Sequence, residues 1–179
     1  GSHLDVRGIQ VFHRRPAVVY PRPVEDSPII SHYGKPPHGT VKSVLKLFVM
    51  VLDWLFGYWL HIRKWRSQGY LVISDRHSLL DMLVDPLRYR YGGPQWLVEK
   101  LLPLAPQPDL ILLLDAPVEV LQSRKTELTD EMATQLREGY LRLSRTRPKF
   151  RVISTTKPVE EVCVEGGEAI KALLPPQRG

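Results

Sequence analysis

The residues best suited to chemistry are Asp75, Arg76 and His77, which directly follow an apolar run ending at Ser74. In open α/β sheets, ligands bind at the carboxyl ends of strands, so a site is expected here. A carboxylate in this place can hold Mg²⁺ through water or orient an acceptor. An adjacent arginine can bridge phosphate oxygens in a bidentate manner. The alternative is an Asp–Arg pair that only caps a turn.

A second carboxylate, Asp115, ends another apolar run and is followed by Arg124 and Lys125. In phosphoryl-transfer sites, cations near the phosphate chain neutralise charge that develops during transfer. Asp115 itself precedes a proline-led helical stretch, and capping of that helix is its expected sole role. A phosphate-binding role is expected of Arg124.

Four short apolar runs predict the strands that position these residues, at 9–13, 70–75, 110–115 and 151–154. The second and third are apolar at nearly every position, which is typical of strands covered on both faces. Helices are expected over 41–65, 94–102, 117–125, 129–147 and 158–174. The alternation predicts an α/β fold with a parallel sheet between two layers of helices, in one domain over 1–174. A proline-rich extended loop at 16–39 and a tail at 175–179 complete the chain.

The 179 residues carry a formal charge of +6, which suits an anionic partner such as a nucleotide, a nucleic acid or a membrane surface. Runs of five or six basic residues are absent, so nucleic acid is not the expected partner. The alternative is an ordinary charged surface with no such partner. Cys163 is the single cysteine, which excludes an intrachain disulfide and fits a reducing cytoplasm.

The run 45–62 is almost continuously apolar but is interrupted by Lys46, Asp53 and His61. A membrane-spanning helix usually tolerates few or no charges. A core helix with Asp53 turned toward a site is therefore favoured over a transmembrane span, and contact with a membrane surface is the weaker alternative. Trp54, Tyr58 and Trp59 in this run are expected in the core and not as a base-stacking platform.

The order of these motifs closely resembles the thymidylate kinase family of P-loop nucleotide kinases. The similarity covers nearly the whole chain, from residue 4 to residue 174, and is greatest to a divergent bacterial branch found among surface-polysaccharide genes. It rests on the strand ending in Asp75-Arg76-His77, the strand ending in Asp115, Arg124, and Tyr140.

This resemblance implies a P-loop kinase fold and phosphorylation of a nucleoside monophosphate, or a related phosphorylated acceptor, with ATP and Mg²⁺. A homodimer through the long helix is also implied. The site residues then divide by role: Asp75, Arg76 and Arg124 as catalytic, Arg14, Arg15, Asp53 and Tyr140 as acceptor-binding, Lys125, Thr156 and Lys157 as ATP-binding, and Asp75 as the metal-site residue.

Several positions depart from the family pattern. Trp54 replaces an arginine that follows Asp53 in the family, and Ser154 stands where the family usually has aspartate. The segment 81–94 is typical of the divergent branch and suggests no chemistry from its residues alone.

The largest departure is the missing phosphate cradle, G-x-x-x-x-G-K-[ST], together with the strand before it. The near match at 34–40 lacks a lysine after Gly39 and contains two prolines, which remove backbone donors. The missing strand would lie centrally in the sheet. It could come from another segment of the protein, which is favoured, or from a partner chain, or the chain could be a relative that has lost catalysis. Alone, the chain is expected to be inactive or very weak, and a non-catalytic nucleotide- or anion-binding or assembly module is the competing reading.

Overall fold

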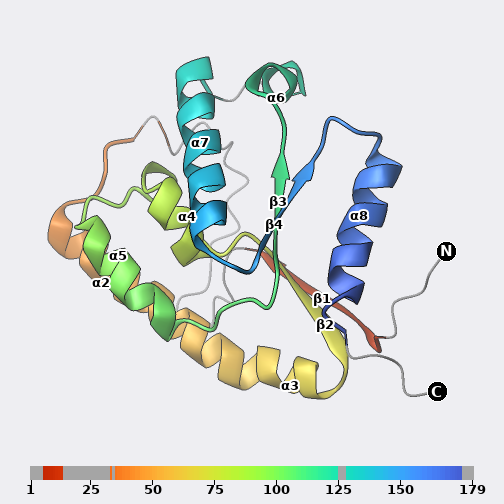
Figure 1. Cartoon of the computed structure of the whole chain (residues 1–179). Coiled ribbons are helices and arrows are strands. Elements are labelled where there is room, and N and C mark those ends of the chain that lie inside the picture. The colour runs from red at the N-terminus through yellow and green to blue at the C-terminus, as the bar shows by residue number, and fades with distance from the viewer. Residues whose placement is uncertain (1–5, 14–32, 34, 125–127, 175–179) are drawn as a thin grey trace. The chain divides into compact units, whose positions relative to one another are not determined.

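The computed structural model describes residues 6–13, 33, 35–124 and 128–174 (Figure 1). The chain divides into two compact units, Gly1–Gln107 and Pro108–Gly179. Each unit is described by itself.

Unit 1 contains a parallel pair of strands, β1 (Gly8–His13) and β2 (Tyr70–Asp75), with His13 opposite Asp75. Parallel neighbours require a long crossover, which is helical here. It consists of α2 (Thr40–Gly57), the π-helical segment η1 (Tyr58–Ile62) and α3 (Arg63–Ser67). Gly69 ends the crossover at φ +81°, a left-handed conformation suited to glycine. After β2 come α4 (Ser78–Val84), the 3-10 turn η2 (Leu87–Tyr89), α5 (Gln95–Leu101) and the 3-10 turn η3 (Leu102–Leu104).

The core of unit 1 forms where α2 packs against α4. Residues three or four apart share one face of a helix, and this spacing buries Leu47, Met50 and Trp54 of α2. Leu79 and Met82 of α4 are fully buried. Each such side chain contributes about 1.5–3 kcal/mol by its removal from water.

Unit 2 also contains a parallel pair, β3 (Ile111–Asp115) and β4 (Phe150–Ser154). Its helices are α6 (Val118–Arg124), α7 (Asp130–Thr146) and α8 (Val159–Lys171). Thr129 caps α7, because its hydroxyl accepts from the Met132 N–H at 3.3 Å. Gly166 of α8 is buried against the sheet, where a Cβ would make an ordinary contact with the Leu112 side chain at 3.6 Å.

The sequence predicted all four strands to within one residue at each end. It did not predict α4 or the π-helical segment. The expectation that β2 and β3 are covered on both faces is wrong, since Ile73 and Leu114 are 39% and 58% exposed. Alternate side chains of a strand point to opposite faces. In each unit, the face of the strand that carries the exposed residue is therefore not fully covered.

The helical run Thr40–Ser67 is long and apolar enough to cross a membrane by length and composition, a test that core helices of other proteins also pass. Trp54 is buried at 3% exposure, as predicted, whereas Trp59 is 61% exposed and the core prediction for it is wrong. The Arg63 guanidinium lies 4.7 Å from the Trp59 ring centre. Large apolar side chains are exposed along α2 and η1, here called the outer stripe: Val41, Leu45, Phe48, Leu52, Phe56 and Trp59.

Candidate functional site

The carboxyl end of β2 holds Arg76 in an unusual backbone conformation. Its φ is +73°, which is uncommon for a residue other than glycine, and the Ser74 hydroxyl donates to its carbonyl at 2.6 Å. The Arg76 guanidinium donates through Nη1 to Asp81 Oδ1 at 3.2 Å. Asp75, just before it, is exposed. Strained backbone of this kind concentrates at functional sites.

His77 is a structural residue that begins α4. Its Nδ1 accepts from the Leu80 N–H at 3.4 Å, and its Nε2 faces the Pro106 carbonyl at 3.4 Å, so a neutral ring satisfies both contacts. Burial lowers the pKa of His77 to about 4. The ring is therefore neutral near pH 7 and does not act as a general acid there.

Trp54 occupies the position where the thymidylate kinase family, which the sequence resembles, has an arginine. Its ring stacks on His77 with centroids 4.0 Å apart, and Phe12 meets it edge-on at 5.7 Å. The indole Nε1 donates to the Ser78 hydroxyl at 2.9 Å. Asp53, its neighbour on α2, is fully buried. Packing and one buried hydrogen bond account for Trp54 without a ligand.

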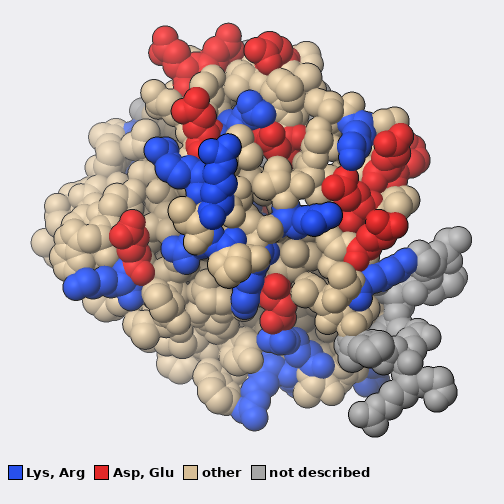
Figure 2. Space-filling model, in the orientation of Figure 1, with Lys and Arg blue, Asp and Glu red and all other residues tan. Residues whose placement is uncertain are grey.

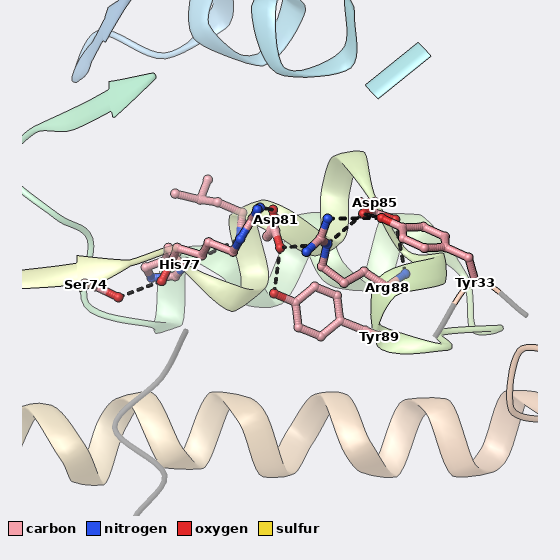
Figure 3. Close-up of polar contacts among 9 residues, drawn as sticks. Tyr33, Ser74, His77, Asp81, Asp85, Arg88 and Tyr89 are labelled. Atoms are coloured by element: carbon pink, nitrogen blue, oxygen red, sulfur yellow. Dashed lines mark hydrogen bonds and ion pairs between the residues drawn. The ribbon is translucent and has the colours of Figure 1, made fainter. Parts of the chain in front are cut away.

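Behind Arg76 lies a group of polar side chains, here called the α4 network (Figure 3). Four of its members are buried residues on and after α4, namely Asp81, Asp85, Arg88 and Tyr89, and the fifth is the half-buried Tyr33, which lies before α2 in the chain. Arg88 Nε donates to Asp85 Oδ2 at 2.9 Å and lies 3.9 Å from Asp81 Oδ2. The Tyr89 hydroxyl donates to Asp81 Oδ2 at 2.8 Å. Asp81 and Asp85 are four residues apart on one helix face, where two carboxylates repel unless a cation lies beside them, and Arg88 supplies it.

Tyr33 joins this network from the far end. Its hydroxyl donates to Asp85 and accepts from Arg88 Nη2, the latter at 3.1 Å. Burial and the bond to Asp85 raise the pKa of Tyr33 to about 12. Burial opposes the charge on Arg88, but its bond to Asp85 and the nearby carboxylates raise the pKa of Arg88 overall.

The near match to a phosphate loop at 34–40 does not form a cradle in its described part. The His38 N–H donates to the Arg90 carbonyl at 2.8 Å, and Arg90 Nε donates to the Pro36 carbonyl at 3.0 Å. Gly92 lies so close that a Cβ there would stand 2.3 Å from the His38 carbonyl oxygen. The segment is thus fastened to residues 90–92, which supports its rejection as a P-loop.

In unit 2, Asp115 ends β3 and forms a bidentate ion pair with α7. Arg137 Nε and Nη2 donate to its two carboxylate oxygens at 2.7 and 2.9 Å. The Thr155 N–H and hydroxyl donate to its carbonyl at 2.7 and 3.1 Å. The prediction that capping is the sole role of Asp115 is wrong, because its carboxylate neutralises Arg137.

The loop after β4 contains two of the predicted ATP-binding residues. Thr156 is exposed, and its hydroxyl lies 2.9 Å from that of Ser154. Lys157 forms an ion pair with Glu165 at 3.0 Å. Tyr140 is half-buried on α7. These contacts leave the predicted roles as predictions.

Asp75, at the end of β2, is the candidate carboxylate for Mg²⁺. Residues 6–13, 35–124 and 128–174 contain no group of three or more His, Cys, Asp or Glu that could hold a metal ion. Mg²⁺ usually keeps several waters and takes one or two protein carboxylates plus substrate phosphates. Asp75 fits such a water-mediated site.

Comparison with known proteins gives matches in sequence and in structure, although no family model matches the chain. It is 32% identical over 107 residues to a probable thymidylate kinase of Thermococcus gammatolerans, over 54% of this chain and 49% of that protein. A probable thymidylate kinase of Metallosphaera sedula is 32% identical over 126 residues, 64% of this chain and 61% of that protein. The chain therefore spans about half the length of the first of these relatives.

Among solved structures, the thymidylate kinase of Candida albicans matches 92% of this chain and 80% of its own, with a TM-score of 0.55 and 18% identity. The chain is thymidylate kinase-like. The α/β, P-loop kinase-like fold and the family resemblance expected from the sequence are confirmed.

In this thymidylate kinase-like chain, the predicted site residues are divided between the units. Unit 1 holds Asp53, Asp75 and Arg76, and unit 2 holds Tyr140, Thr156, Lys157 and the backbone of Arg124, which ends α6. Arg14, Arg15, Lys125 and the Arg124 side chain lie outside the described residues. Arg14 directly follows His13, the residue opposite Asp75 in the strand pair.

Sequence reasoning missed Asp81, Asp85 and Arg88 in unit 1, and Arg137 in unit 2. The available signal was spacing, because Asp81 and Asp85 are four apart and Arg88 follows three residues later. Two carboxylates at helical spacing followed closely by an arginine predict a local ion-pair network. No comparable local pattern links Asp115 to Arg137.

Proposed function

We propose that this chain is part of a cytoplasmic nucleoside monophosphate kinase. The enzyme would transfer the γ-phosphoryl group of ATP to thymidylate or a related phosphorylated acceptor. The observation that carries this proposal is Arg76, a strained and partly exposed arginine at a strand end. Its setting in a chain with thymidylate kinase-like sequence and fold supports the assignment.

The proposed chemistry requires positioning and electrostatic stabilisation, with no covalent intermediate. Arg76 would bind phosphoryl oxygens, and Asp75 would hold water bound to Mg²⁺. Arg14 or Arg15 would bind the acceptor phosphate from the residues after β1. From unit 2, Arg124 and Lys125 would contribute positive charge, and Thr156 and Lys157 would lie near ATP. Asp53 and Tyr140 would contact the acceptor.

We propose that a further strand, bearing the phosphate cradle, comes from another segment of the protein or from a partner chain. Within the described residues, each unit contains a sheet of two strands. Two-stranded sheets are marginal in water. The exposed Ile73 of β2 and Leu114 of β3 provide apolar surface that additional structure would cover.

The test is a coupled ADP-release assay with ATP, Mg²⁺ and thymidine monophosphate or other nucleoside monophosphates. It uses the chain alone and with a P-loop segment supplied at its amino end. Turnover is expected with the added segment only, and Arg76→Lys should lower it by about 10²-fold or more. Full turnover by the chain alone would contradict the need for an added cradle. No turnover in either form would contradict the kinase assignment.

The competing function is a non-catalytic module that binds nucleotides or other anions, and the lack of a cradle in this sequence favours it. Calorimetry separates the two functions for the chain completed with the P-loop segment. A kinase should bind both ATP and thymidine monophosphate, whereas an acceptor-site module should bind the monophosphate and ignore ATP.

We also propose that the outer stripe packs against a second copy of the chain. Its residues follow one another at intervals of four, three, four, four and three, close to the seam of a two-helix coiled coil, over roughly 27 Å of helix. Analytical ultracentrifugation should show a dimer that Leu45→Glu with Leu52→Glu dissociates. A monomeric wild-type chain that sediments with anionic liposomes would instead indicate a membrane-surface role.

A further inference from the structure

We infer that Asp81 is a positioning residue for the Arg76 guanidinium and is itself held in place by Tyr89 and Arg88. This inference rests on the proposed function for its consequence, the binding of a phosphomonoester. The geometric claim itself concerns only the contact between Asp81 and Arg76. The segment that carries Asp81 had suggested no chemistry from its sequence.

The two oxygens of Asp81 are divided between different partners. Oδ1 accepts from Arg76 Nη1 at 3.2 Å. Oδ2 accepts from the Tyr89 hydroxyl at 2.8 Å and lies 3.9 Å from Arg88 Nε. Because Oδ2 is held from behind by Tyr89 and Arg88, the carboxylate cannot turn away from Arg76 without losing those contacts.

Exposure changes sharply along this chain of contacts. The side chain of Asp81 is 4% exposed and that of Arg88 8%, whereas Arg76 is 36% exposed. Within the described part of the chain, Nη1 is the only guanidinium nitrogen of Arg76 that donates to a protein acceptor. A guanidinium has five N–H donors, so this arginine is fixed at one corner and keeps donors for a ligand on its solvent side.

The charge arrangement favours a role in positioning over a role in stability alone. Burying an ion pair carries a desolvation penalty, so buried pairs are weak stabilisers compared with apolar packing. Here the buried charges contact, through Asp81, a strained and partly exposed arginine, Arg76, whose φ is +73°. The network therefore limits the directions available to a side chain whose backbone is already constrained, which lowers the entropy lost when it binds an anion.

The test compares Asp81→Asn with Asp85→Asn in the full chain. Both residues are buried carboxylates beside Arg88, and both changes preserve shape, but only Asp81 contacts Arg76. The first readout is ¹⁵N relaxation of Arg76 Nε, which reports side-chain order without any ligand. The second is the dissociation constant for thymidine monophosphate by calorimetry.

Asp81→Asn should make Arg76 Nε as mobile as that of the exposed Arg151 and weaken binding by roughly tenfold, whereas Asp85→Asn should leave both within about twofold. Unchanged Arg76 order in Asp81→Asn, or equal effects in both variants, would overturn the inference. If neither variant folds, the wild-type chain still decides it, because Arg76 must be more ordered than Arg151. A wild-type chain that binds no thymidine monophosphate while Arg76 is ordered by Asp81 would refute the proposed acceptor and leave the positioning role standing.

Discussion

The ends of β2 and β3 offer a comparison between two sites built from the same sequence pattern. Each strand is apolar and ends in an aspartate, Asp75 in unit 1 and Asp115 in unit 2. Asp115 is paired with Arg137 through both of its oxygens. At the end of β2, the neighbouring Arg76 is held by Asp81, a different carboxylate on the following helix, and Asp75 is exposed.

This difference shows that a strand-end aspartate does not by itself make a site. What matters is which carboxylate neutralises the nearest arginine, and how deeply that carboxylate is buried. In unit 2 the pair is closed and lies 18–33% exposed. In unit 1 the neutralising groups are nearly buried and the arginine remains partly in solvent. Figure 2 shows that basic and acidic side chains both lie on the face in view.

The largest expected effect comes from Arg88→Met, which removes the cation of the α4 network. Asp81 and Asp85 would then remain buried without it, and breaking a buried pair in this way costs about 3–5 kcal/mol. Urea denaturation measures the loss in unfolding free energy. The matched change in unit 2, Arg137→Met, should cost about 1 kcal/mol or less because that pair is partly exposed. Equal losses would remove the distinction between the two sites.

The second prediction concerns the pH dependence of stability that His77 gives to unit 1. Unit 2 has no counterpart, because all six histidines lie before residue 108. The folded-state pKa of His77 is lowered to about 4 from 6.5, so between these values the unfolded state binds the extra proton. The contribution of neutral His77 to the unfolding free energy is therefore fully present above about pH 6.5. Up to about 3 kcal/mol of it is lost as the pH falls to about 4.

Urea denaturation across this pH range checks the prediction, with His77→Asn as the control. Asparagine can still accept from the Leu80 N–H as a helix cap but does not titrate. The slope of unfolding free energy against pH should flatten in the variant. An unchanged slope would mean that His77 is not held neutral by its buried setting.

A third, smaller effect is expected from Trp54→Phe. The stack on His77 can persist, but the Ser78 hydroxyl loses the Nε1 donor, at a cost of about 1–3 kcal/mol. The control is Trp96→Phe, since Trp96 is 56% exposed and its change should be close to neutral. Thermal denaturation of both variants tests whether the aromatic stack supports the site in unit 1.

The smallest expected effect is that of Asp115→Asn, about 1 kcal/mol or less, because Arg137 remains 33% exposed and can be solvated. Salt sharpens the comparison with unit 1. The effect of Asp115→Asn should shrink further in 1 M NaCl, where exposed charges are screened, whereas that of Arg88→Met should persist. Loss of both effects in salt would mean that the two pairs are equally accessible to solvent.

Patterns with a local physical cause were the ones readable from the sequence. Apolar runs predicted the strands, and the long helix expected over 41–65 ends two residues later, at Ser67, just before Gly69 with φ +81°. Asp75 and Arg76 were recognised as a strand-end pair because the apolar run stops there. The role of Asp81 was missed because α4 has only seven residues, too few for a periodic signal. The pairing of Asp115 with Arg137 depends on how α7 packs in unit 2, which no local pattern encodes.

The π-helical segment Tyr58–Ile62 has a consequence for any comparison of the long helix with a regular one. A π turn accommodates one residue more than an α turn, so it resets the angular phase of everything that follows. Deleting one residue within 58–62 would restore a continuous α-helix and rotate Arg63, Lys64 and Arg66 by roughly 100° about its axis. A relative that lacks one residue here would therefore present the basic end of this helix in a different direction.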